Sequence, residues 1–353
     1  MSIEKEEFQE KLLAWYKSGH RILPWRDDPT AYHVWISEIM LQQTRVEAVK
    51  PYYQRFMEVL PTVYDLKEIS DEKLLKLWEG LGYYSRARNL KKAACKIVEE
   101  YDGKIPDTYE ELISLPGIGD YTAGAILSIA YQKPYPALDG NVFRVLTRVF
   151  ANPVDILSTK GKKEIRELLL SILPTSDNSS FTQALMELGA VVCIPSGEPH
   201  CHACPLKHMC IAHQNHQELL YPVKSAKKKR KIENRYVFLI TCRNRVLLNK
   251  RKETGLLANF YEFPNVFVED KTEVLDTILK PFSLHPVSMK KLASYKHIFT
   301  HIEWHMTGYH IETSEETEGI WATLEELEHI YPIPNAFIKY KQELETILDK
   351  DTK

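Results

Sequence analysis

Apolar side chains recur at helical spacing along the first 214 residues of the chain. Phe8, Leu12, Leu13 and Tyr16 follow the spacing of one helix face, and the apolar positions of 35–40 repeat it. Further helices are predicted near residues 84–101, 120–130, 140–150, 161–173 and 179–192. Proline, glycine and asparagine separate these runs, so residues 1–214 are predicted to be almost entirely helical.

The pattern becomes strand-like after residue 234. The runs RYVFLIT (235–241) and RVLLNKR (245–251) are rich in strand-forming residues and are joined by a short polar stretch. Later strands are predicted at 290–299 and 303–312, with helices near 272–280 and at 335–349. The sequence therefore predicts a second, smaller α+β domain over residues 235–353, and the chain of 353 residues is long enough for two cores.

Charge is concentrated in the segment between these two regions. Residues 221–232, YPVKSAKKKRKI, carry six cations and no anion, whereas the whole chain has 46 cationic and 48 anionic residues. A net charge of -2 excludes a basic field over the whole molecule, so any nucleic-acid contact must come from local patches. We therefore predict an interdomain linker at 215–234, which is either a solvated tether or a DNA contact.

The composition, with 44% apolar and 27% charged residues, is typical of a globular protein. No run approaches the roughly 20 apolar residues that a membrane span needs. The first twenty residues are too acidic and too polar for a secretory signal. We therefore expect an intracellular protein that makes no membrane contact.

Four of the six cysteines lie within 18 residues, with the spacing C-x7-C-x2-C-x5-C. They are Cys193, Cys201, Cys204 and Cys210. Without an export signal, such a group indicates a metal or cluster site more than disulfides. One close pair with an outlier on each side favours a [4Fe-4S] cluster, and zinc remains the alternative. The isolated Cys95 and Cys242 are expected to be small buried side chains.

A double-glycine turn separates two predicted helices at Leu115–Ile126, LPGIGDYTAGAI. Gly117 and Gly119 permit positive φ and allow the backbone to approach a ligand closely. The N–H groups at the start of the following helix could then bind a phosphate. This is the helix-hairpin-helix pattern, which binds the DNA backbone without reading sequence. The alternative is an ordinary helix–turn–helix joint.

Two carboxylates occur in unlike surroundings. Glu38 lies among apolar residues, where burial should raise its pKa and keep a proton on it. Asp139 lies just before a predicted helix, whose N–H groups and dipole favour the ionised form. One protonated and one ionised carboxyl is the arrangement that glycosidic bond cleavage requires. Each also has a plain alternative, since Asp139 could be only an N-cap and Glu38 only the exposed side of a helix.

Polar and aromatic residues suited to a DNA interface follow in three short segments. LPWR (23–26), LQQTR (41–45, with Gln43 and Thr44) and GLGYYSRARN (81–90) offer such side chains in predicted loops or at helix ends. Aromatic or amide side chains can wedge into a base stack while a nucleotide is extruded. The alternative is that the tyrosines are core residues and the arginines a solvated face.

These features, in this order, resemble the adenine DNA glycosylases of the MutY family. WISEIMLQQTRVE, WEGLGYYSRARNL, LPGIGDYTAGAI and ALDGNVFRVLTR stand in the family's order and are followed by ALMELGAVVC and the cysteines. The resemblance implies a mainly α helix-hairpin-helix glycosylase fold over 1–214, with its hairpin at 115–126 and a [4Fe-4S] loop at 193–210. It also implies removal of adenine mispaired with 8-oxoguanine or guanine in double-stranded DNA, a cytoplasmic location at the bacterial nucleoid, and a monomer.

The resemblance assigns roles to matching residues. It makes Glu38 the acid that protonates adenine, Asp139 the carboxylate that stabilises the sugar cation, and Tyr121 a neighbour of that cation. Asn141 would orient Asp139. The remaining matches are Arg26 and Gln183 in the adenine pocket, Gln43 and Tyr83 near 8-oxoguanine, and Gly117 and Gly119 in the hairpin. Thr44, beside Gln43, is a further candidate for DNA binding.

Two alternatives to this function remain at the level of sequence. Endonuclease III-type enzymes share the fold and the cluster, but they carry a lysine just after the hairpin glycines that leads to strand cleavage. Here that position is Tyr121, which cannot form a Schiff base, so a monofunctional hydrolase that leaves an abasic site is favoured over a glycosylase/lyase acting on oxidised pyrimidines. A catalytically silent DNA-binding scaffold is the other alternative.

The C-terminal domain is similar to the family's Nudix-like recognition domain. LLANFYEFPN (256–265) resembles its hallmark, while the acidic metal-binding Nudix box is missing from TEVLDTILKPF (272–282), so pyrophosphate hydrolysis is not expected. Phe299, Thr300 and His301 match the family's loop that contacts 8-oxoguanine. One departure concerns the cysteines: the family's first interval has six residues and this chain has seven, which a loop can absorb.

Overall fold

The computed structural model describes residues 4–226, 229–268 and 286–351. The chain forms two compact units: Met1–Glu68 with Arg88–Ala226, and Ile69–Ala87 with Lys227–Lys353. Both units therefore include residues from the first third of the sequence. The predicted division at the linker did not place residues 69–87 with the C-terminal sheet, where the structure groups them.

The first unit is helical, as predicted. Its main helices are α1 (Lys5–Ser18), α2 (Ala31–Leu41), α3 (Val46–Val59), α4 (Val63–Glu68), α6 (Ser85–Glu100, which begins just before this unit), α7 (Tyr109–Ile113), α8 (Asp120–Ala125), α9 (Gly140–Val149), α10 (Thr159–Ile172), α11 (Asn178–Val191) and α12 (Ile211–Gln214). Short turns of 3-10 helix follow at η2 (Cys201–Ala203) and η3 (Glu218–Leu220).

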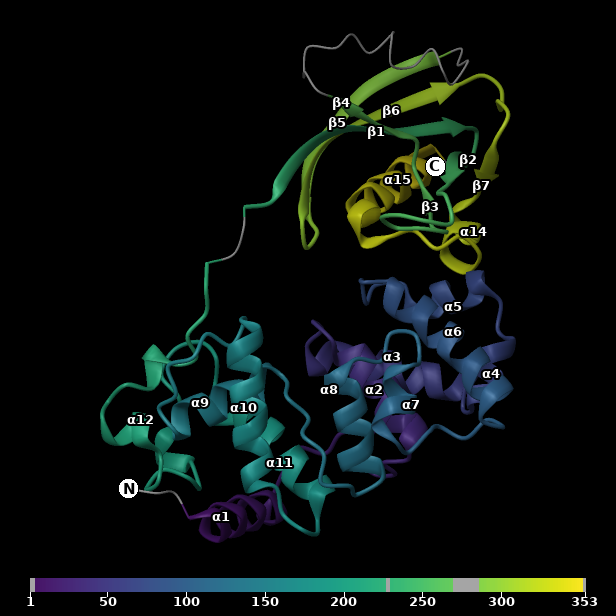
Figure 1. The fold of residues 1–353 in the computed structure, drawn as a ribbon. Helices are drawn as coiled ribbons and strands as arrows, with labels where there is room; N and C mark the ends of the chain where they lie inside the picture. Colours follow the sequence, from purple (N-terminus) through teal and green to yellow (C-terminus); the bar gives the residue numbers. More distant parts are fainter. Residues whose placement is uncertain (1–3, 227–228, 269–285, 352–353) are drawn as a thin grey trace. The chain divides into compact units, whose positions relative to one another are not determined.

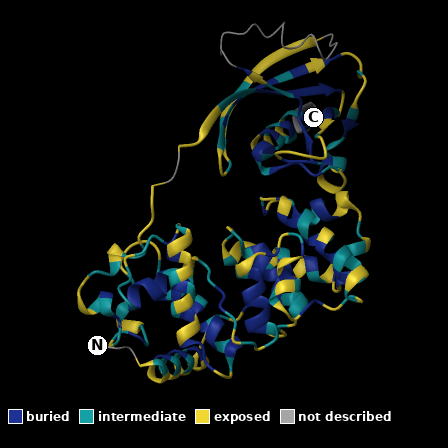
Figure 2. Ribbon diagram, viewed as in Figure 1, coloured by how far each residue is buried: buried dark blue, intermediate teal, exposed yellow. Residues whose placement is uncertain are grey.

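One core of this unit lies where α1, α9, α10 and α11 pack together (Figure 1). Phe8 and Leu12 of α1 are fully buried, and the Phe8 ring lies 6.2 Å from that of Phe181 on α11. Figure 2 shows α9 and α11 buried over much of their length. The apolar spacing predicted this face correctly, except that Leu13 is only half-buried.

The predicted helix at 120–130 changes character in its middle. It begins as α8 and continues as the π-helical turn η1 (Ile126–Ala130). The Ser128 hydroxyl donates to the carbonyl oxygen of Gly124 at 2.7 Å. A Cβ atom on Gly124 would lie 2.2 Å from the carbonyl oxygen of Pro136, so this helix packs against the 136–137 backbone without a side chain between them.

The second unit is built on a mixed sheet with the strand order β3-β2-β1-β6-β5, in which β4 also pairs with β1 and β7 with β2 (Figure 1). Its strands are β1 (Lys231–Cys242), β2 (Arg245–Lys250), β3 (Tyr261–Glu262), β4 (Asn265–Val268), β5 (Pro286–Ile298), β6 (Ile302–Thr313) and β7 (Ile320–Ala322). β1 and β6 are parallel, and the other pairs are antiparallel. The four predicted strands correspond to β1, β2, β5 and β6.

Helices complete this unit. They are α5 (Asp71–Trp78), α14 (Leu324–His329), η5 (Asn335–Phe337) and α15 (Ile338–Asp351), the last of which confirms the predicted terminal helix. α15 packs on the sheet through Tyr340, whose ring lies 5.1 Å from that of Tyr295 on β5. The predicted helix at 272–280 and the segment that lacks the Nudix box lie outside the described residues. Among the described helices, none is long and apolar enough to cross a membrane.

Candidate active site

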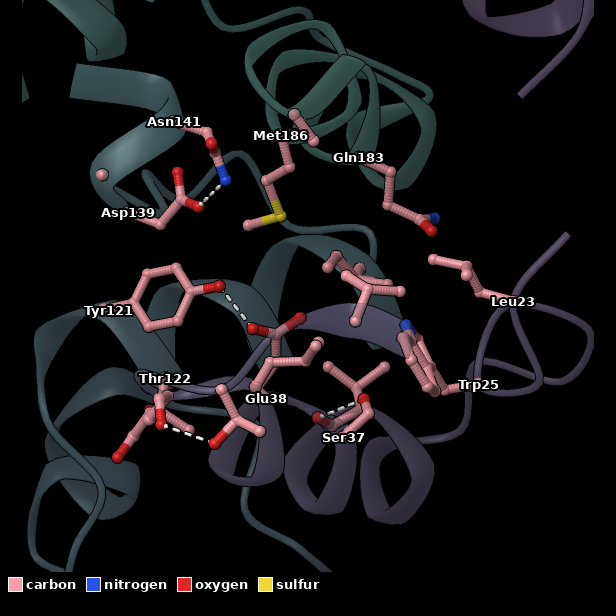
Figure 3. Close-up of a pocket in the computed structure, with 18 of the residues that line it drawn as sticks. Leu23, Trp25, Ser37, Glu38, Tyr121, Thr122, Asp139, Asn141, Gln183 and Met186 are labelled. Atoms are coloured by element: carbon pink, nitrogen blue, oxygen red, sulfur yellow. Dashed lines mark hydrogen bonds between the residues drawn. The ribbon is translucent and has the colours of Figure 1, made fainter. Parts of the chain in front are cut away.

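A cavity of about 730 Å³ in the first unit collects most of the residues singled out in the sequence (Figure 3). Its walls come from the loop before α2, from α2 itself, the hairpin turn, α8, the start of α9, and α11. The predicted site residues that line it are Arg26, Glu38, Gln43, Thr44, Gly117, Gly119, Tyr121, Asp139, Asn141 and Gln183. Residues 38 and 139, which are far apart in the sequence, therefore open into the same cavity.

Glu38 is held in an apolar helix. Seven consecutive residues of α2, from Val34 to Met40, are buried, and Glu38 itself is 6% exposed. Burial raises the pKa of Glu38 to about 7, and the nearby charge of Asp139 acts in the same direction. The predicted raised pKa is confirmed, and near neutral pH this carboxyl can hold a proton.

Tyr121 links the hairpin to this acid. It lies in the first turn of α8, and its Oη donates a hydrogen bond to Oε2 of Glu38 (Figure 3). This hydrogen bond lowers the pKa of Glu38 and partly offsets the effect of burial. Burial and the two nearby carboxylates raise the pKa of Tyr121, so the phenol stays neutral and remains a donor.

Asp139 is the N-cap of α9, as the plain alternative expected, and it also lines the cavity. Its Oδ1 accepts from the Val142 N–H at 2.7 Å, and its Oδ2 accepts from Nδ2 of Asn141 at 2.6 Å. Burial nevertheless raises the pKa of Asp139, while these donors and the charge of Arg144 lower it. The N–H group at the helix start favours the ionised form of Asp139, as predicted, but burial opposes it and is the larger effect, so the pKa is raised overall.

Arg144 was not singled out in the sequence. Its Nη2 donates to Oδ1 of Asn141 at 2.8 Å, which orients the amide so that Nδ2 faces Asp139. Its Nε donates to the carbonyl oxygen of Cys193 at 2.6 Å, and the side chain is 6% exposed. An arginine flanked by apolar residues on both sides, in VFRVL (142–146), was the only sequence signal for this role.

A second buried network supports the other side of the cavity. Glu187 of α11 is 1% exposed and accepts from Nε of Arg21 at 2.7 Å and from Nη2 of Arg26 at 2.9 Å. These two arginines lower the pKa of Glu187 to about 2 against the effect of burial, so it is ionised. Gln183, one turn earlier on α11, also faces the cavity (Figure 3). Glu187 was missed because its spacing fits an ordinary helix face.

The two hairpin glycines differ in conformation. Gly117 has φ +80°, and a Cβ atom there would lie 2.7 Å from Cβ of Asn89, so both backbone and space require glycine. Gly119 has φ -108° and is the N-cap of α8, so only Gly117 of the two uses the positive φ that glycine permits. No atom lies within 4 Å of a Cβ at Gly119, so its backbone is open to a ligand.

Four predicted residues belong to the second unit rather than to the cavity wall: Tyr83, Phe299, Thr300 and His301. Thr300 and His301 are exposed in the turn between β5 and β6, which the Phe299 N–H closes by donating to the Ile302 carbonyl at 2.8 Å. Their side chains are available to an external partner.

The four clustered cysteines line one small pocket in the first unit, and none of the six cysteines forms a disulfide. Nη1 of Arg148 lies 3.3 Å from Sγ of Cys193. Burial, together with neighbouring thiols, raises the pKa of Cys204 to about 12 and that of Cys210 to about 11. Thiols packed this closely ionise together only around a cationic centre, so the donor set fits a thiolate-bound metal or cluster.

The extra residue of the first cysteine interval is taken up in a loop. The His200 N–H donates to the Val192 carbonyl at 2.9 Å, and Nη1 of Arg148 donates to the Ile194 carbonyl at 3.0 Å. Of the isolated cysteines, Cys242 is buried as predicted and Cys95 is half-buried. A further potential ligand group joins Cys201 with His213 and Glu218, whose ligand atoms lie within 4.8 Å of one another.

Two family models match separate parts of the chain. A family model described as "HhH-GPD superfamily base excision DNA repair protein" matches residues 36–175, and one described as "NUDIX domain" matches residues 236–343. In solved structures, the chain is similar to a thermostable thymine-DNA glycosylase, with a TM-score of 0.55 and 26% identity over 60% of this chain and 97% of that one.

Two curated relatives span nearly the whole chain. The adenine DNA glycosylase of Buchnera aphidicola subsp. Acyrthosiphon pisum (strain APS) is 36% identical, over 92% of this chain and 93% of its own length. That of Buchnera aphidicola subsp. Schizaphis graminum (strain Sg) is 35% identical, over 90% and 93%. With the helical unit, the carboxylate-lined cavity and the C-terminal sheet unit all present, the chain belongs to the adenine DNA glycosylase family of base excision repair enzymes.

Proposed function

We propose that this enzyme extrudes adenine opposite 8-oxoguanine or guanine from double-stranded DNA and hydrolyses its N-glycosidic bond, leaving an abasic site. The observation that carries the proposal is the cavity that Glu38, Tyr121 and Asp139 share. A cavity of about 730 Å³ is large enough for one nucleoside. DNA as the partner follows from the family, whereas the particular mispairs are part of the proposal.

Glu38 is proposed as the general acid. Because Tyr121 donates to Oε2, a proton on the carboxyl resides at Oε1, from which it can pass to a ring nitrogen of adenine. Protonation turns the base into a better leaving group. A carboxyl with a pKa of about 7 is well matched to this task near neutral pH.

Asp139 is proposed to stabilise the sugar cation that forms as the bond breaks. Two hydrogen bonds hold its carboxylate, from the Val142 N–H and from Nδ2 of Asn141. Both donors favour the anion, which in turn stabilises an oxocarbenium-like sugar. Water then adds to the sugar, forming the new C–O bond, and its released proton restores the proton that Glu38 gave to adenine.

The remaining walls suit the base. Arg26, fixed by Glu187, and Gln183 both line the cavity and can offer hydrogen-bonding groups to a base. Figure 3 shows Gln183 at the end of the cavity away from Asp139. The hairpin turn with Gly117 and Gly119 supports a role in binding the DNA backbone, because the space beside Gly119, at the start of α8, is open.

A lyase reaction is disfavoured. It needs a lysine amine that attacks the sugar, and no lysine is found among the described residues that line the cavity. The position after the hairpin glycines holds Tyr121, which is already bonded to Glu38. We therefore propose a monofunctional glycosylase.

We further propose that Cys193, Cys201, Cys204 and Cys210 hold a [4Fe-4S] cluster. When bound, the cluster supplies the cationic iron centre that compensates the thiolates and fixes loop 193–210. Arg148 donates toward Cys193 and would stabilise that thiolate as a ligand. Tetrahedral zinc is the competing occupant, since four thiolates also suit it.

The second unit is proposed to recognise the base opposite adenine. Thr300 and His301 are exposed in their turn and can hydrogen-bond to 8-oxoguanine, with Phe299 beside them. Tyr83, 44% exposed, is proposed to insert near the same base. We propose that the enzyme acts as a monomer on the DNA of the bacterial nucleoid.

The test is adenine release by the full chain from a duplex with one adenine:8-oxoguanine pair, beside an undamaged adenine:thymine duplex. We expect free adenine from the first only, and strand breaks only after alkali or heat. Nicking without such treatment would indicate the lyase alternative. Tight binding with no adenine at any pH would indicate a silent scaffold.

A further inference from the structure

Residues 69–87 form part of the second compact unit, although they are far in sequence from its sheet. Several hydrogen bonds join them to residues of the C-terminal part of the chain. Nζ of Lys76 donates to the Leu327 carbonyl at 2.9 Å, the Ile333 N–H donates to Oε1 of Glu79 at 2.9 Å, and Nδ2 of Asn335 donates to the Gly80 carbonyl at 2.8 Å.

Buried apolar contact accompanies these hydrogen bonds. The Tyr84 ring lies 4.1 Å from the Phe260 ring, and the two side chains are 5% and 0% exposed. Oη of Tyr84 also accepts from the Asn335 N–H at 3.4 Å. Since both rings are buried, this contact belongs to the packed interior of the second unit. We call Asn335, Ile333 and Phe260 the clasp.

The turn that the clasp holds has an unusual backbone. Gly80, Gly82 and Tyr83 have φ values of 103°, 70° and 48°, so three of four successive residues are left-handed. A tyrosine in this region is costly and persists only where its surroundings fix it. Inside the turn, Nη2 of Arg86 donates to the Leu81 and Gly82 carbonyls, each at 3.0 Å. Asn335 adds a hydrogen bond to the Gly80 carbonyl from a residue outside the turn.

We propose that the clasp positions Tyr83 for discrimination of the base opposite adenine, with Asn335 as the positioning residue. The inference rests on the proposed function, in which Tyr83 lies near 8-oxoguanine. Tyr83 itself is 44% exposed and is not a member of the clasp. The backbone of 80–84 sets the direction in which the Tyr83 side chain points. Asn335 restrains this backbone through its hydrogen bond to the Gly80 carbonyl. Excision of adenine opposite guanine, which offers no oxidised group, should depend less on that direction.

The test replaces the amide by an isosteric carboxylate in the full chain. Asn335→Asp removes the donor and sets an anionic oxygen against the Gly80 carbonyl. Gln342→Glu makes the same chemical change at an exposed position of α15 and is the matched control. Asn335→Ala is the second variant, in case the aspartate variant does not fold.

Single-turnover adenine release is measured from adenine:8-oxoguanine and adenine:guanine duplexes, and hydrogen exchange is followed for the amides of 79–86. We expect the ratio of the two rates to fall about tenfold in Asn335→Asp, with the adenine:guanine rate within about twofold of wild type. Exchange of the Leu81 and Arg86 amides, which close the turn onto Trp78 and Tyr83, should become faster. Gln342→Glu should change neither quantity.

Three outcomes overturn the inference: an unchanged ratio, a proportional fall of both rates, or unchanged exchange in 79–86. They are distinct from a failure of the proposed function, which would appear in the wild type itself. A wild-type enzyme that releases no adenine, or that shows no preference for 8-oxoguanine, overturns both.

Discussion

Tyr121 donates its phenolic hydrogen bond to Oε2 of Glu38 from a helix 83 positions further along the chain. The hydrogen bond lowers the pKa of a buried carboxyl that burial raises to about 7. Tyr121→Phe should therefore raise that pKa further. Because the acid acts in its protonated form, the alkaline limb of the pH–rate profile should move to higher pH. The rate on the acidic side should fall roughly tenfold as the acid loses its orientation.

The profile is measured by single-turnover adenine release between pH 5 and 9. Tyr295→Phe is the matched control, because Tyr295 also donates to a glutamate, Glu343, but in the second unit. An alkaline limb that stays in place, or moves to lower pH, would show that Tyr121 does not lower the pKa of Glu38.

Glu38→Gln should abolish base release while DNA binding persists. The amide keeps the size of the side chain but cannot deliver a proton, and loss of a general acid costs about 10²–10⁴-fold in rate. Adenine release and duplex binding are measured on the same preparation. Glu47→Gln, at an exposed glutamate paired with Lys50, is the control. An active Glu38→Gln enzyme would mean that another group is the acid.

The same substitution should change the pH dependence of stability. In the unfolded chain Glu38 ionises near its ordinary pKa of 4.5, whereas in the folded protein it keeps its proton until about 7. Its favourable contribution is thus complete below pH 4.5 and is lost as pH rises through 7. Relative to wild type, Glu38→Gln should gain on the order of 3 kcal/mol between these limits. Urea unfolding at pH 5 and pH 8.5 tests this, and parallel stability curves for the two proteins would contradict it.

Cys204→Ser should remove the cluster. With one thiolate missing from the pocket, we expect the visible absorption, the iron and the acid-labile sulfide to fall together. Cys95→Ser, at a half-buried cysteine outside the group, should leave all three unchanged. Stoichiometric zinc in the wild-type protein, with no labile sulfide, would favour the tetrahedral metal instead.

Thr300→Ala combined with His301→Ala should lower the preference for 8-oxoguanine over guanine. Both side chains are exposed in the β5–β6 turn, so their removal leaves no cavity and should not affect folding. Loss of two hydrogen bonds to the lesion corresponds to roughly tenfold or more in the ratio of rates. Thr346→Ala on α15 is the control. An unchanged preference for 8-oxoguanine over guanine would show that this turn does not recognise the lesion.

Long elements could be predicted from the sequence because their apolar period repeats several times. Helices α1, α9 and α11 and strands β1 and β6 are of this kind. Strand β3 has two residues and β7 has three, too few to show a period. Their place is set by pairing with β2, which is not a local property of the sequence.

The site divides in a similar way. Glu38 could be recognised because its neighbours in the chain are themselves apolar and buried. The burial of Asp139 could not be recognised, because its cover comes from other elements. The sequence therefore indicated the donors that lower its pKa but not the burial that raises it. Asn335 was missed because its partners also lie on distant elements. The contact of Asn335 with Gly80 joins residues 255 positions apart, and no spacing rule reaches that far.

Because residues 69–87 belong to the second unit, proteolysis within 227–231 does not separate the two units cleanly. The backbone passes from one unit to the other three times, at 68/69, 87/88 and 226/227, and only the last of these crossings is the lysine-rich stretch. A protease that cleaves there cannot release two complete halves. The C-terminal fragment would lack α5 and Tyr84, so the Phe260 ring would become exposed to solvent. Expressed alone, residues 227–353 should therefore be less stable than the same residues in the full chain.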